Sequence, residues 1–382
     1  MRVLFVSHTV LMAGANRSLF QLMLELRDNY GVEPIVLMPS IPKYYEKWNL
    51  YKACRKHGIE CYSYRFHWFK DKRRLIYYVR CLSNLIYYPI IFFKFRKLKV
   101  DIVHSNGSVI SLGGFLSRQL CVPHVWHLRE FGQLDFGLYS LLGAGYERWI
   151  YQKADAYIAI SDVVKKHYRS LVPEEKMKMI YNGIVPPVKD SGKRSNDDTI
   201  EFCMVGVVSS PKNQLEALKA LDVIINEWGE RQVHLPFIGF EEPLYANSLR
   251  SYIEAKNLGQ YVSFLGERED VNALLCNMHV GLMLSGNEAF GRVTVEYMMQ
   301  GLAVIASNTG ANPEIVVDGA SGFLYQLGNY RELADRMRKL IEDKETLFNF
   351  AKKGKERALK LFTSIKNTKQ VYEVYEELLK SK

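Results

Sequence analysis

Short runs of apolar residues alternate along the chain with longer segments in which apolar residues recur at helical spacing. In the first half the runs that predict strands are 2–7, 33–38, 59–64, 100–104, 123–128, 155–160 and 177–181. In the second half they are 201–208, 232–239, 261–266, 279–284 and 302–307. Helices are predicted between these runs, for instance over 15–29, 161–170 and 213–228. Strands that are apolar throughout and separated by helices are typical of parallel sheets covered on both faces.

The alternation is interrupted over 185–198, where two prolines are followed by serine, glycine and charged residues. Such a composition is typical of a domain linker. We therefore predict an α/β protein with two doubly wound Rossmann-like domains, over 1–185 and 186–360, that face each other across a cleft. Residues 361–382 contain an amphipathic segment, which is predicted to be a helix that packs back toward the N-terminal domain. In doubly wound sheets, ligands bind beyond the carboxyl ends of the strands.

Composition narrows the class of protein. With 382 residues, 48% of them apolar and 24% charged, the chain is expected to be globular with a sizeable core. Its six cysteines are scattered and form no Cys-x-x-Cys pair, which argues against a zinc site or a disulfide framework and favours a reducing compartment. The N-terminal run is predicted to be a buried strand rather than a signal peptide. No uninterrupted apolar stretch of about 18 residues occurs, so no segment is expected to span a membrane.

Charge is unevenly distributed. Residues 1–185 hold 27 Lys and Arg against 14 Asp and Glu, so the first half carries the basic excess and is expected to meet an anionic partner. The segment 65–99 combines ten Lys and Arg with ten aromatic residues and one acid, Asp71, and Pro89 interrupts it. Basic and aromatic residues together suit a helix in an anionic headgroup layer, so we expect this segment to face a membrane. Single-stranded nucleic acid is a rival partner that the aliphatic runs disfavour, and a helix pair with an ordinary core is the other alternative.

Residues 285–301, SGNEAFGRVTVEYMMQG, place two glutamates around a Phe-Gly pair at the predicted start of a helix. Glu288 falls in the loop after a predicted strand, and Gly291 permits close approach of the backbone. The backbone N–H groups of residues 290–293 then form an anion site. Two carboxylates would repel a phosphate, so Glu288 and Glu296 are expected to bind sugar hydroxyls on either side of a diphosphate. The alternative is that Glu288 is only a charge at a helix N-terminus and Glu296 a solvated residue.

This stretch and the residues that follow it resemble the signature of family 4 glycosyltransferases, which are retaining enzymes with the GT-B fold. The similarity covers nearly the whole chain, with further matches at 14–19, 159–168, 180–187 and 264–270. It implies that Glu288 contacts the donor sugar and that Glu296 holds the ribose. The donor-binding residues expected at the helix start are Phe290, Gly291, Arg292 and Val293.

A second donor loop is predicted at 204–214, where Gly206 and Lys212 follow a strand. Lys212 stands where the family uses a lysine on the diphosphate, and a merely solvated lysine is the alternative. The chain departs from the family pattern at Val207, where an arginine is common. Arg292, which the resemblance places beside the same phosphate, is the candidate replacement.

The N-terminal domain supplies the remaining candidates. Gly14, at the start of the first helix, is predicted to let backbone N–H groups approach the leaving phosphate, and Asn16 is able to cap that helix. His127 ends the fifth strand; the resemblance places a histidine there on the donor sugar, and a purely structural histidine is the alternative. Arg129 and Glu130 are candidates to touch the acceptor, or else an ordinary exposed pair. The other histidines at strand ends, His8 and His104, are expected to be structural.

Together these features predict a retaining hexosyltransferase that uses a nucleoside diphosphate sugar, with UDP-sugars favoured and GDP-sugars as the second choice. The resemblance implies a membrane-linked saccharide acceptor, a role in lipopolysaccharide or capsule synthesis, and a peripheral location on the cytoplasmic face of the inner membrane. No Asp-x-Asp occurs, so we expect neither metal nor cofactor, and we expect no nucleic-acid partner. The rivals are a sugar-nucleotide epimerase or hydrolase, an inactive nucleotide-binding module and, weakest, a dehydrogenase, since no Gly-x-Gly-x-x-Gly follows the first strand.

Overall fold

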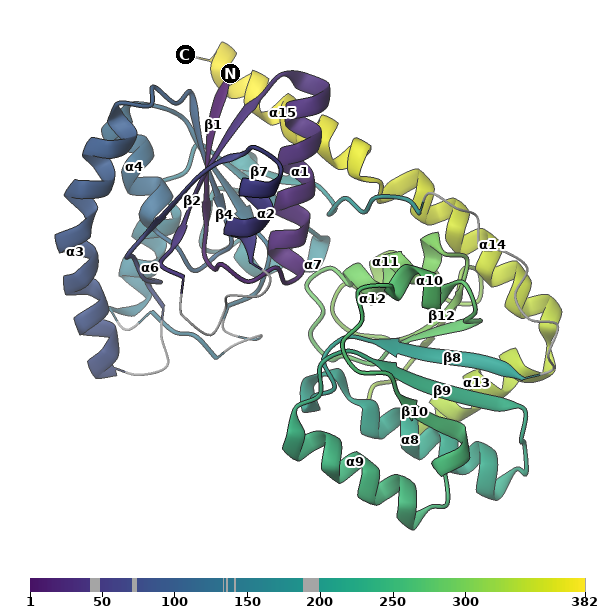
Figure 1. The fold of residues 1–382 in the computed structure, drawn as a ribbon. Helices are drawn as coiled ribbons and strands as arrows, with labels where there is room; N and C mark the ends of the chain where they lie inside the picture. The colour runs from purple at the N-terminus through teal and green to yellow at the C-terminus, as the bar shows by residue number, and fades with distance from the viewer. Residues whose placement is uncertain are drawn as a thin grey trace. The chain divides into compact units, whose positions relative to one another are not determined.

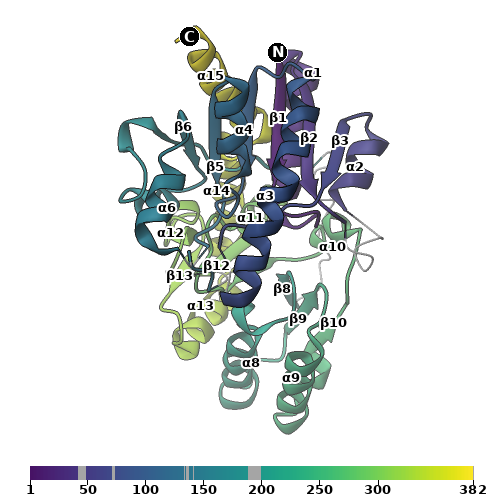
Figure 2. The same cartoon turned by 90° about the vertical axis from the view of Figure 1, so that its left-hand side faces the viewer.

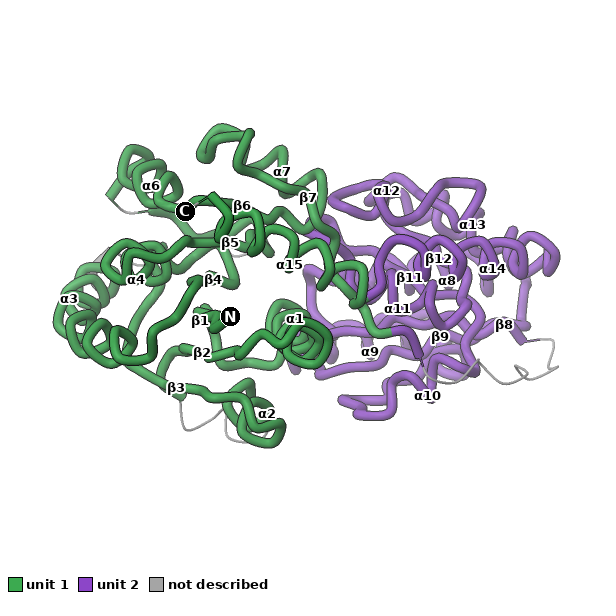
Figure 3. Tube along the Cα trace, turned by 90° about the horizontal axis from the view of Figure 1, so that it is seen from above, with its two compact units in different colours: residues 1–185, 364–382 green, residues 186–363 purple. Residues whose placement is uncertain are grey.

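The chain folds into two compact units, shown in Figure 3. The computed structural model describes all residues except 42–48, 71–73, 133, 135, 136, 141, 188–198 and 382. Unit 1 consists of Met1–Val185 and Ser364–Lys382, and unit 2 of Pro186–Thr363. Most of the predicted linker, and Asp71 of the basic segment, lie outside the described residues.

Unit 1 is built on a seven-stranded parallel sheet with the strand order β3-β2-β1-β4-β5-β6-β7. Its strands are β1 (Arg2–Ser7), β2 (Glu33–Pro39), β3 (Glu60–Tyr64), β4 (Ile102–Asn106), β5 (His124–Leu128), β6 (Ala156–Ala159) and β7 (Met177–Met179). The order reverses between β1 and β4, which makes the carboxyl ends of these two strands the expected ligand position.

Strand residues point alternately to two cores, because successive side chains of a strand face opposite sides of the sheet. Val3 and Phe5 of β1 join one core, and Leu4 and Val6 join the other. Helices α1 (Gly14–Tyr30), α2 (Leu50–Lys56) and α15 (Ser364–Lys380) contribute to the first core, and α3 (Arg74–Arg96) and α4 (Leu112–Leu120) to the second. Unit 1 also contains α6 (Gly143–Tyr151) and α7 (Asp162–Tyr168).

The C-terminal helix α15 is part of unit 1, although it follows unit 2 in the sequence. It packs beside α1 (Figure 1), and its Val371, Val374 and Tyr375 are buried in the same core as Val3 and Phe5. Gly183 lies against the start of α15, where an added Cβ would come within 2.5 Å of the Cα of Ser364. The last segment of the chain therefore completes the N-terminal fold.

Unit 2 repeats the design with a six-stranded parallel sheet of order β10-β9-β8-β11-β12-β13. Its strands are β8 (Ile200–Val205), β9 (Val233–Ile238), β10 (Val262–Phe264), β11 (Val280–Met283), β12 (Ala303–Ser307) and β13 (Phe323–Tyr325). Its helices are α8 (Gln214–Asp222), α9 (Pro243–Ala255), α10 (Val271–Leu275), α11 (Arg292–Met299), α12 (Asn312–Ile315), α13 (Tyr330–Glu342) and α14 (Lys344–Leu361). The strand order reverses between β8 and β11. The predicted fold class of two Rossmann-like domains is confirmed.

Helix α3 differs from the sequence expectation. It runs as one helix with Pro89 inside it and lies on the outside of unit 1 next to α4 (Figure 2). Proline removes one backbone hydrogen bond from a helix, but buried residues lie on both sides of it: Tyr77 comes before Pro89, and Ile91 and Phe95 come after it. Its part Ile76–Arg96 is also long and apolar enough to cross a membrane by length and composition, contrary to the expectation that no segment qualifies.

Candidate functional site

The start of helix α11 lies at the carboxyl edge of the unit 2 sheet, directly after the loop that follows β11. Gly291 caps the helix with φ of 79°, a left-handed conformation that glycine adopts without strain. A Cβ at this position would lie 3.2 Å from Thr294 Oγ1 and 3.4 Å from Asn312 Oδ1. Both of these polar atoms are buried and lack a hydrogen-bond partner among the described residues. The helix start is therefore a tight polar corner, in the position predicted for a diphosphate.

The turn at 309–312 fixes the backbone of Glu288. The N–H of Ala311 donates to the carbonyl oxygen of Glu288 at 2.8 Å. Gly310 has φ of 56°, and a Cβ there would lie 2.5 Å from the same carbonyl oxygen. The turn at 309–312 thus packs closely against the backbone of the loop that carries Glu288.

Lys212 and Glu288 form an ion pair with 2.5 Å between Nζ and Oε1. Lys212 ends the 3-10 turn Ser210–Lys212 ahead of α8, in the loop after β8, and β8 is the direct neighbour of β11. The glutamate side chain is 16% exposed and the lysine 36%, so the pair is partly shielded from water. A phosphate that recruited Lys212 would release the carboxylate for other hydrogen bonds.

Arg292 and Glu296 form a second ion pair one turn apart on α11, with 2.9 Å between Nε and Oε1. Both side chains are 22% exposed. Two acids and two cations thus lie along the carboxyl edge. Each cation that is predicted to bind phosphate is paired with an acid that is predicted to bind a sugar. Chemically, such a site suits a ligand that carries both negative charge and hydroxyl groups.

The remaining donor candidates of unit 2 frame this corner. Phe290 is buried and packs edge to face on Phe362 at 5.9 Å between ring centroids, and Val293 is half-buried. Gly206 has φ of 138°, and the space beyond its hydrogen is open. Val207, which stands where a cation was expected, is 41% exposed and supplies no charge. Gly206 and Lys212 lie in the loop after β8, and Glu288 lies in the loop between β11 and the start of α11. Because β8 and β11 are neighbouring strands, these two loops lie at the same edge of the sheet.

In unit 1, His127 is fully buried at the end of β5. Its Nδ1 lies 3.2 Å from His104 Nε2 and 3.3 Å from Arg129 Nη2. Burial, with the neighbouring charge of Arg129 and the ring of His104, holds the pKa of His127 well below its usual range, so the imidazole is neutral. Its Nε2 is buried and has no hydrogen-bond partner among the described residues.

Arg129 and Glu130 are both buried, so neither is an ordinary exposed residue. Arg129 donates from Nε to Asn106 Oδ1 and from Nη1 to Asn182 Oδ1. Glu130 accepts through Oε1 from the backbone N–H of Ser108 at 2.5 Å and from its hydroxyl at 3.0 Å. These hydrogen bonds all go to protein groups, and contact with an acceptor stays a prediction.

Gly14 is the first residue of α1 and has open space beside its Cα. Asn16 does not cap this helix, contrary to expectation, because the capping position is Ala13 and makes no side-chain bond. Asn16 is instead buried and donates from Nδ2 to the carbonyl oxygens of Thr9 and Leu11. Its side chain shapes the loop between β1 and α1.

Two residues that sequence reasoning did not place at the site are brought to it by the fold. His104 contacts His127, and its Nδ1 lies 2.6 Å from the hydroxyl of Tyr375 in α15. The expectation that His104 is merely structural therefore misses its direct link to a site candidate. The sequence could have predicted the contact of His104 with His127, since both residues lie near the ends of successive predicted strands. It could not have predicted the contact with Tyr375, which lies 271 positions from His104.

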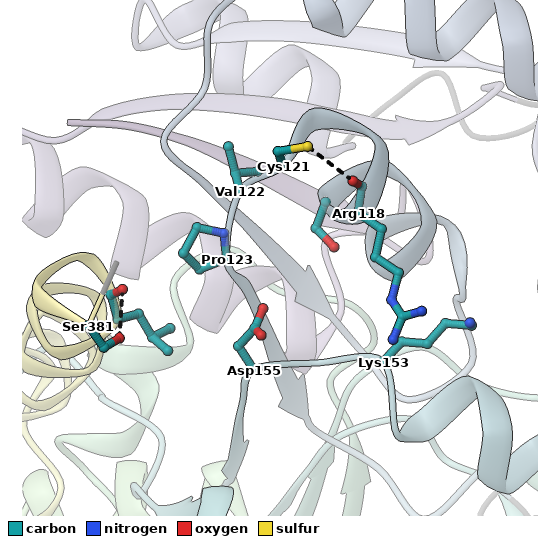
Figure 4. A pocket seen from close by; sticks show the side chains of 9 residues that line it. Arg118, Cys121, Val122, Pro123, Lys153, Asp155 and Ser381 are labelled. Carbon is teal, nitrogen blue, oxygen red and sulfur yellow. Dashed lines mark hydrogen bonds between the residues drawn. The ribbon is translucent and has the colours of Figure 1, made fainter.

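A cavity of about 330 Å³ lies elsewhere in unit 1 (Figure 4). It is lined by Arg118, Lys153 and Asp155, among others, close to the amino ends of β5 and β6. None of the predicted site residues lines it. Because ligands of doubly wound sheets bind at the carboxyl edge, this cavity is not the candidate site.

Known proteins are similar to both units. A family model described as Glycosyltransferase Family 4 matches residues 12–186, and one described as Glycosyl transferases group 1 matches residues 188–357. The uncharacterized glycosyltransferase MJ1178 of Methanocaldococcus jannaschii is 25% identical over 283 residues, which are 73% of this chain and 76% of that protein. The N-acetyl-alpha-D-glucosaminyl L-malate synthase of Bacillus anthracis is 32% identical over 119 residues, 31% of either chain.

Solved structures share the fold. The Anabaena protein HepE in complex with UDP superposes with a TM-score of 0.82 and 21% identity, covering 99% of this chain and 100% of that one. A glycosyltransferase from Rickettsia africae superposes with a TM-score of 0.83 and 17% identity, covering 100% of this chain and 99% of that one.

Proposed function

This chain belongs to glycosyltransferase family 4, and from that membership we propose its donor, its acceptor and its mechanism. It is a glycosyltransferase with the GT-B fold. The proposed reaction moves a hexose-type sugar from a nucleoside diphosphate to a hydroxyl of a membrane-linked saccharide, with retention of configuration. The observation that carries the proposal is a set of two ion pairs. Lys212 pairs with Glu288 between the loops that follow β8 and β11, and Arg292 pairs with Glu296 at the start of α11.

A diphosphate with a sugar at each end matches this pattern. The cations Lys212 and Arg292, with the N–H groups at the helix start, would hold the phosphates. The released carboxylates of Glu288 and Glu296 would then accept hydrogen bonds from the donor sugar and from the ribose. The structure of HepE was solved with UDP and with UDP-glucose, and this supports a UDP-sugar over a GDP-sugar as the donor.

In the proposed mechanism, the main contribution of the protein is to stabilise the departing diphosphate. The bond between the anomeric carbon and the phosphate oxygen breaks, and the acceptor oxygen forms a new bond on the same face of the sugar. The acceptor proton passes to the departing phosphate oxygen, so no metal and no covalent nucleophile is required. Lys212, Arg292 and the helix start offset the charge that develops on that oxygen. Glu288 and the neutral His127 orient the sugar.

The outer face of α3 supports a membrane-linked acceptor. Seven large apolar side chains, each more than half exposed, recur on this face at helical spacing: Tyr78, Val79, Leu82, Leu85, Ile86, Ile90 and Phe93. The opposite face is held in the core by buried residues such as Tyr77 and Phe95. An exposed apolar stripe of this kind is typical of a helix that lies parallel to a membrane, with its apolar side chains in the lipid and its other face packed on the protein.

The charges around this stripe favour an anionic lipid surface over a second copy of the chain. The described helix from Ile76 to Arg96 contains no acid, and Arg96, Lys97 and Lys99 follow its apolar face. Two copies of α3 would bring like charges together, whereas each basic residue near an anionic membrane contributes about 1 kcal/mol. We infer a peripheral location on the cytoplasmic face of the inner membrane, in lipopolysaccharide or capsule synthesis.

Nucleotide release tests the reaction. The full chain is incubated with UDP-glucose and other nucleoside diphosphate sugars, with and without lipid-linked saccharides extracted from membranes. Release that depends on the extract, with sugar recovered in the lipid fraction, is expected. Equal release without the extract would identify a hydrolase or epimerase, and donor binding without release under any condition would identify a binding module.

Vesicle binding tests the membrane surface. Leu85→Glu combined with Ile86→Glu is expected to lower co-sedimentation with phosphatidylglycerol vesicles more than tenfold, because two apolar side chains worth about 1.5–3 kcal/mol each no longer enter the lipid. UDP binding is expected to stay unchanged. Leu244→Glu on α9 is the control, since Leu244 is 88% exposed but belongs to unit 2. Equal binding of both variants, or wild-type binding to neutral vesicles alone, would contradict the proposal.

A further inference from the structure

Three fully buried side chains lie in a row that ends at His127, the residue of unit 1 that is predicted to bind the donor sugar. The hydroxyl of Tyr375 in α15 lies 2.6 Å from His104 Nδ1 in β4. The other ring nitrogen of His104, Nε2, lies 3.2 Å from His127 Nδ1 in β5. All three residues are 0% exposed, so water does not compete for these contacts.

The position of each proton along this line follows from Arg129. A guanidinium group only donates hydrogen bonds, so His127 Nδ1, which lies 3.3 Å from Arg129 Nη2, must be an acceptor. Burial lowers the pKa of His127 well below its usual range, so the ring is neutral and its single proton is on Nε2. Arg129 is itself fixed by Asn106 and Asn182, which accept from its other nitrogens.

The same reasoning extends one residue further. Because His127 Nδ1 accepts, His104 Nε2 must carry a proton and donate it. Burial also keeps His104 neutral by lowering its pKa, so its Nδ1 has no proton and accepts from the Tyr375 hydroxyl. Tyr375, His104 and Arg129 therefore agree on one tautomer of His127.

This tautomer directs a buried N–H group away from the network. His127 Nε2 makes no hydrogen bond within the described part of the chain, and it is buried. A buried donor without a partner is unfavourable unless a ligand supplies an acceptor. His127 lies on the carboxyl edge of the sheet, where ligands of this fold bind.

We propose that Tyr375 and His104 are positioning residues that hold His127 as an N–H donor toward a hydroxyl oxygen of the donor sugar. This assignment rests on the proposed function for the identity of the ligand. The last helix of the chain thereby acts on sugar transfer through one hydroxyl group, in addition to filling the core of unit 1.

The first test reads the tautomer itself in the full chain. With histidine labelled in ¹⁵N and ¹³C, long-range NMR correlations are expected to show His127 protonated on Nε2 between pH 6 and 8. Tyr375→Phe removes the hydroxyl and is expected to let an Nδ1-protonated form of His104 appear, in which His104 Nε2 no longer donates to His127 and Arg129 alone holds that ring. Tyr372→Phe is the matched control on the same helix, because Tyr372 stacks on Tyr30 at 4.3 Å and stands outside the line. Wild-type His127 protonated on Nδ1 would overturn the proposal.

The second test reads transfer. Tyr375→Phe is expected to lower kcat about three- to tenfold with little change in KM, as for loss of one orienting hydrogen bond, while Tyr372→Phe does not. His104→Gln keeps one acceptor and one donor in the line and is expected to retain most activity, whereas His104→Leu is expected to lose it. A shifted tautomer with unchanged kcat, or equal activity of His104→Gln and His104→Leu, would overturn the positioning role.

The two tests separate this proposal from the proposed function. If no nucleoside diphosphate sugar is turned over by the wild-type chain, the proposed function fails. In that case the NMR measurement still decides whether Tyr375 sets the proton of His104, and with it the hydrogen bond from His104 to His127. A Tyr375→Phe spectrum identical to that of the wild type would overturn the relay whatever the substrate is.

Discussion

At the scale of single residues, the ion pair between Arg292 and Glu296 contributes little to stability. Pairs of this spacing on a helix surface stabilise a protein by only about 0.3–0.5 kcal/mol. The pair stands instead at the start of α11, where a bound diphosphate would draw Arg292 to itself. We therefore expect the pair to contribute to the affinity for the ligand rather than to the stability of the fold.

Glu296→Ala tests that expectation. Loss of a hydrogen bond between a carboxylate and the ribose is expected to weaken UDP binding about tenfold or more, since bonds to charged groups contribute about 1.5–3 kcal/mol. Isothermal titration with UDP, GDP and ADP measures the effect. Glu342→Ala is the matched control, because Glu342 pairs with Arg338 at the same spacing and a distance of 2.7 Å on α13. Unchanged affinity for all three nucleotides would refute the proposed ribose contact.

Buried histidines predict an acid sensitivity of unit 1. Burial lowers the pKa of His124 to about 3, and also lowers those of His104 and His127. In the unfolded chain these rings titrate near their ordinary pKa of about 6.5. Below that pH the unfolded state binds protons that the folded state does not, so stability is complete above pH 6.5 and falls as the solution is acidified.

His124→Gln measures one share of this effect. Each buried ring contributes a loss of at most about 1.4 kcal/mol per pH unit, so the variant is expected to show a pH slope smaller by about that amount between pH 6 and 5. Denaturant unfolding followed by tryptophan fluorescence reports mainly unit 1, which holds four of the five tryptophans. Identical slopes for His124→Gln and the wild-type chain would show that His124 is not held neutral.

The sequence predicts the position of candidate residues in the fold well where one short motif carries them. Glu288, Gly291 and Glu296 lie within nine positions, so a strand, a glycine and a helix start were enough to place them. Tyr375 was out of reach, because it meets His104 only after α15 has returned to unit 1. Local spacing does not encode such a contact.

At the scale of elements, the turn before α12 sets the position of Glu288. Gly310→Ala adds a Cβ that would lie 2.5 Å from the Glu288 carbonyl oxygen, in a left-handed backbone conformation. We expect unit 2 to lose about 2–4 kcal/mol of unfolding free energy, from backbone strain and overpacking together. UDP affinity is expected to fall as well, because the Glu288 loop must move.

Gly319→Ala separates the two causes. Gly319 also has a left-handed φ, of 69°, but an added Cβ meets no atom within 4 Å. Its loss is expected to be about 1–2 kcal/mol, from backbone strain alone, with UDP affinity unchanged. Denaturant unfolding and titration of both variants with UDP provide the comparison. Equal losses of stability and affinity in the two variants would contradict a backing role for the turn.

The order and type of the predicted elements largely match the structure, because buried parallel strands leave clear apolar runs. The mismatches have local causes. The predicted helix 213–228 ends its regular part at Asp222 and continues as the π-helical turn Val223–Glu227, a change that apolar spacing does not reveal. Strand β13 has only three residues, too few for a periodic pattern. Helix α3 continues through Pro89 because tertiary contacts hold both of its halves.

At the scale of the whole molecule, the chain enters unit 2 once and then returns. Both termini belong to unit 1, and α15 is the segment that closes it. Val371, Val374 and Tyr375 bury their side chains in the core shared with α1 and β1. The N-terminal unit is therefore incomplete until the last part of the chain has been made.

A chain that ends at Thr363 tests this dependence. Burial of the two valines and the tyrosine contributes about 1.5–3 kcal/mol for each side chain, and their sum is a large fraction of the 5–15 kcal/mol that stabilises a typical domain. Unit 1 of the shortened chain is expected to unfold at much lower denaturant, while unit 2 still binds UDP, because no donor residue of unit 2 lies in α15. A chain that ends at Leu379 is the control and is expected to behave as the full chain. If both shortened chains unfold over the same denaturant range, α15 is not needed for the core of unit 1, and the positioning role of Tyr375 would lose its structural basis.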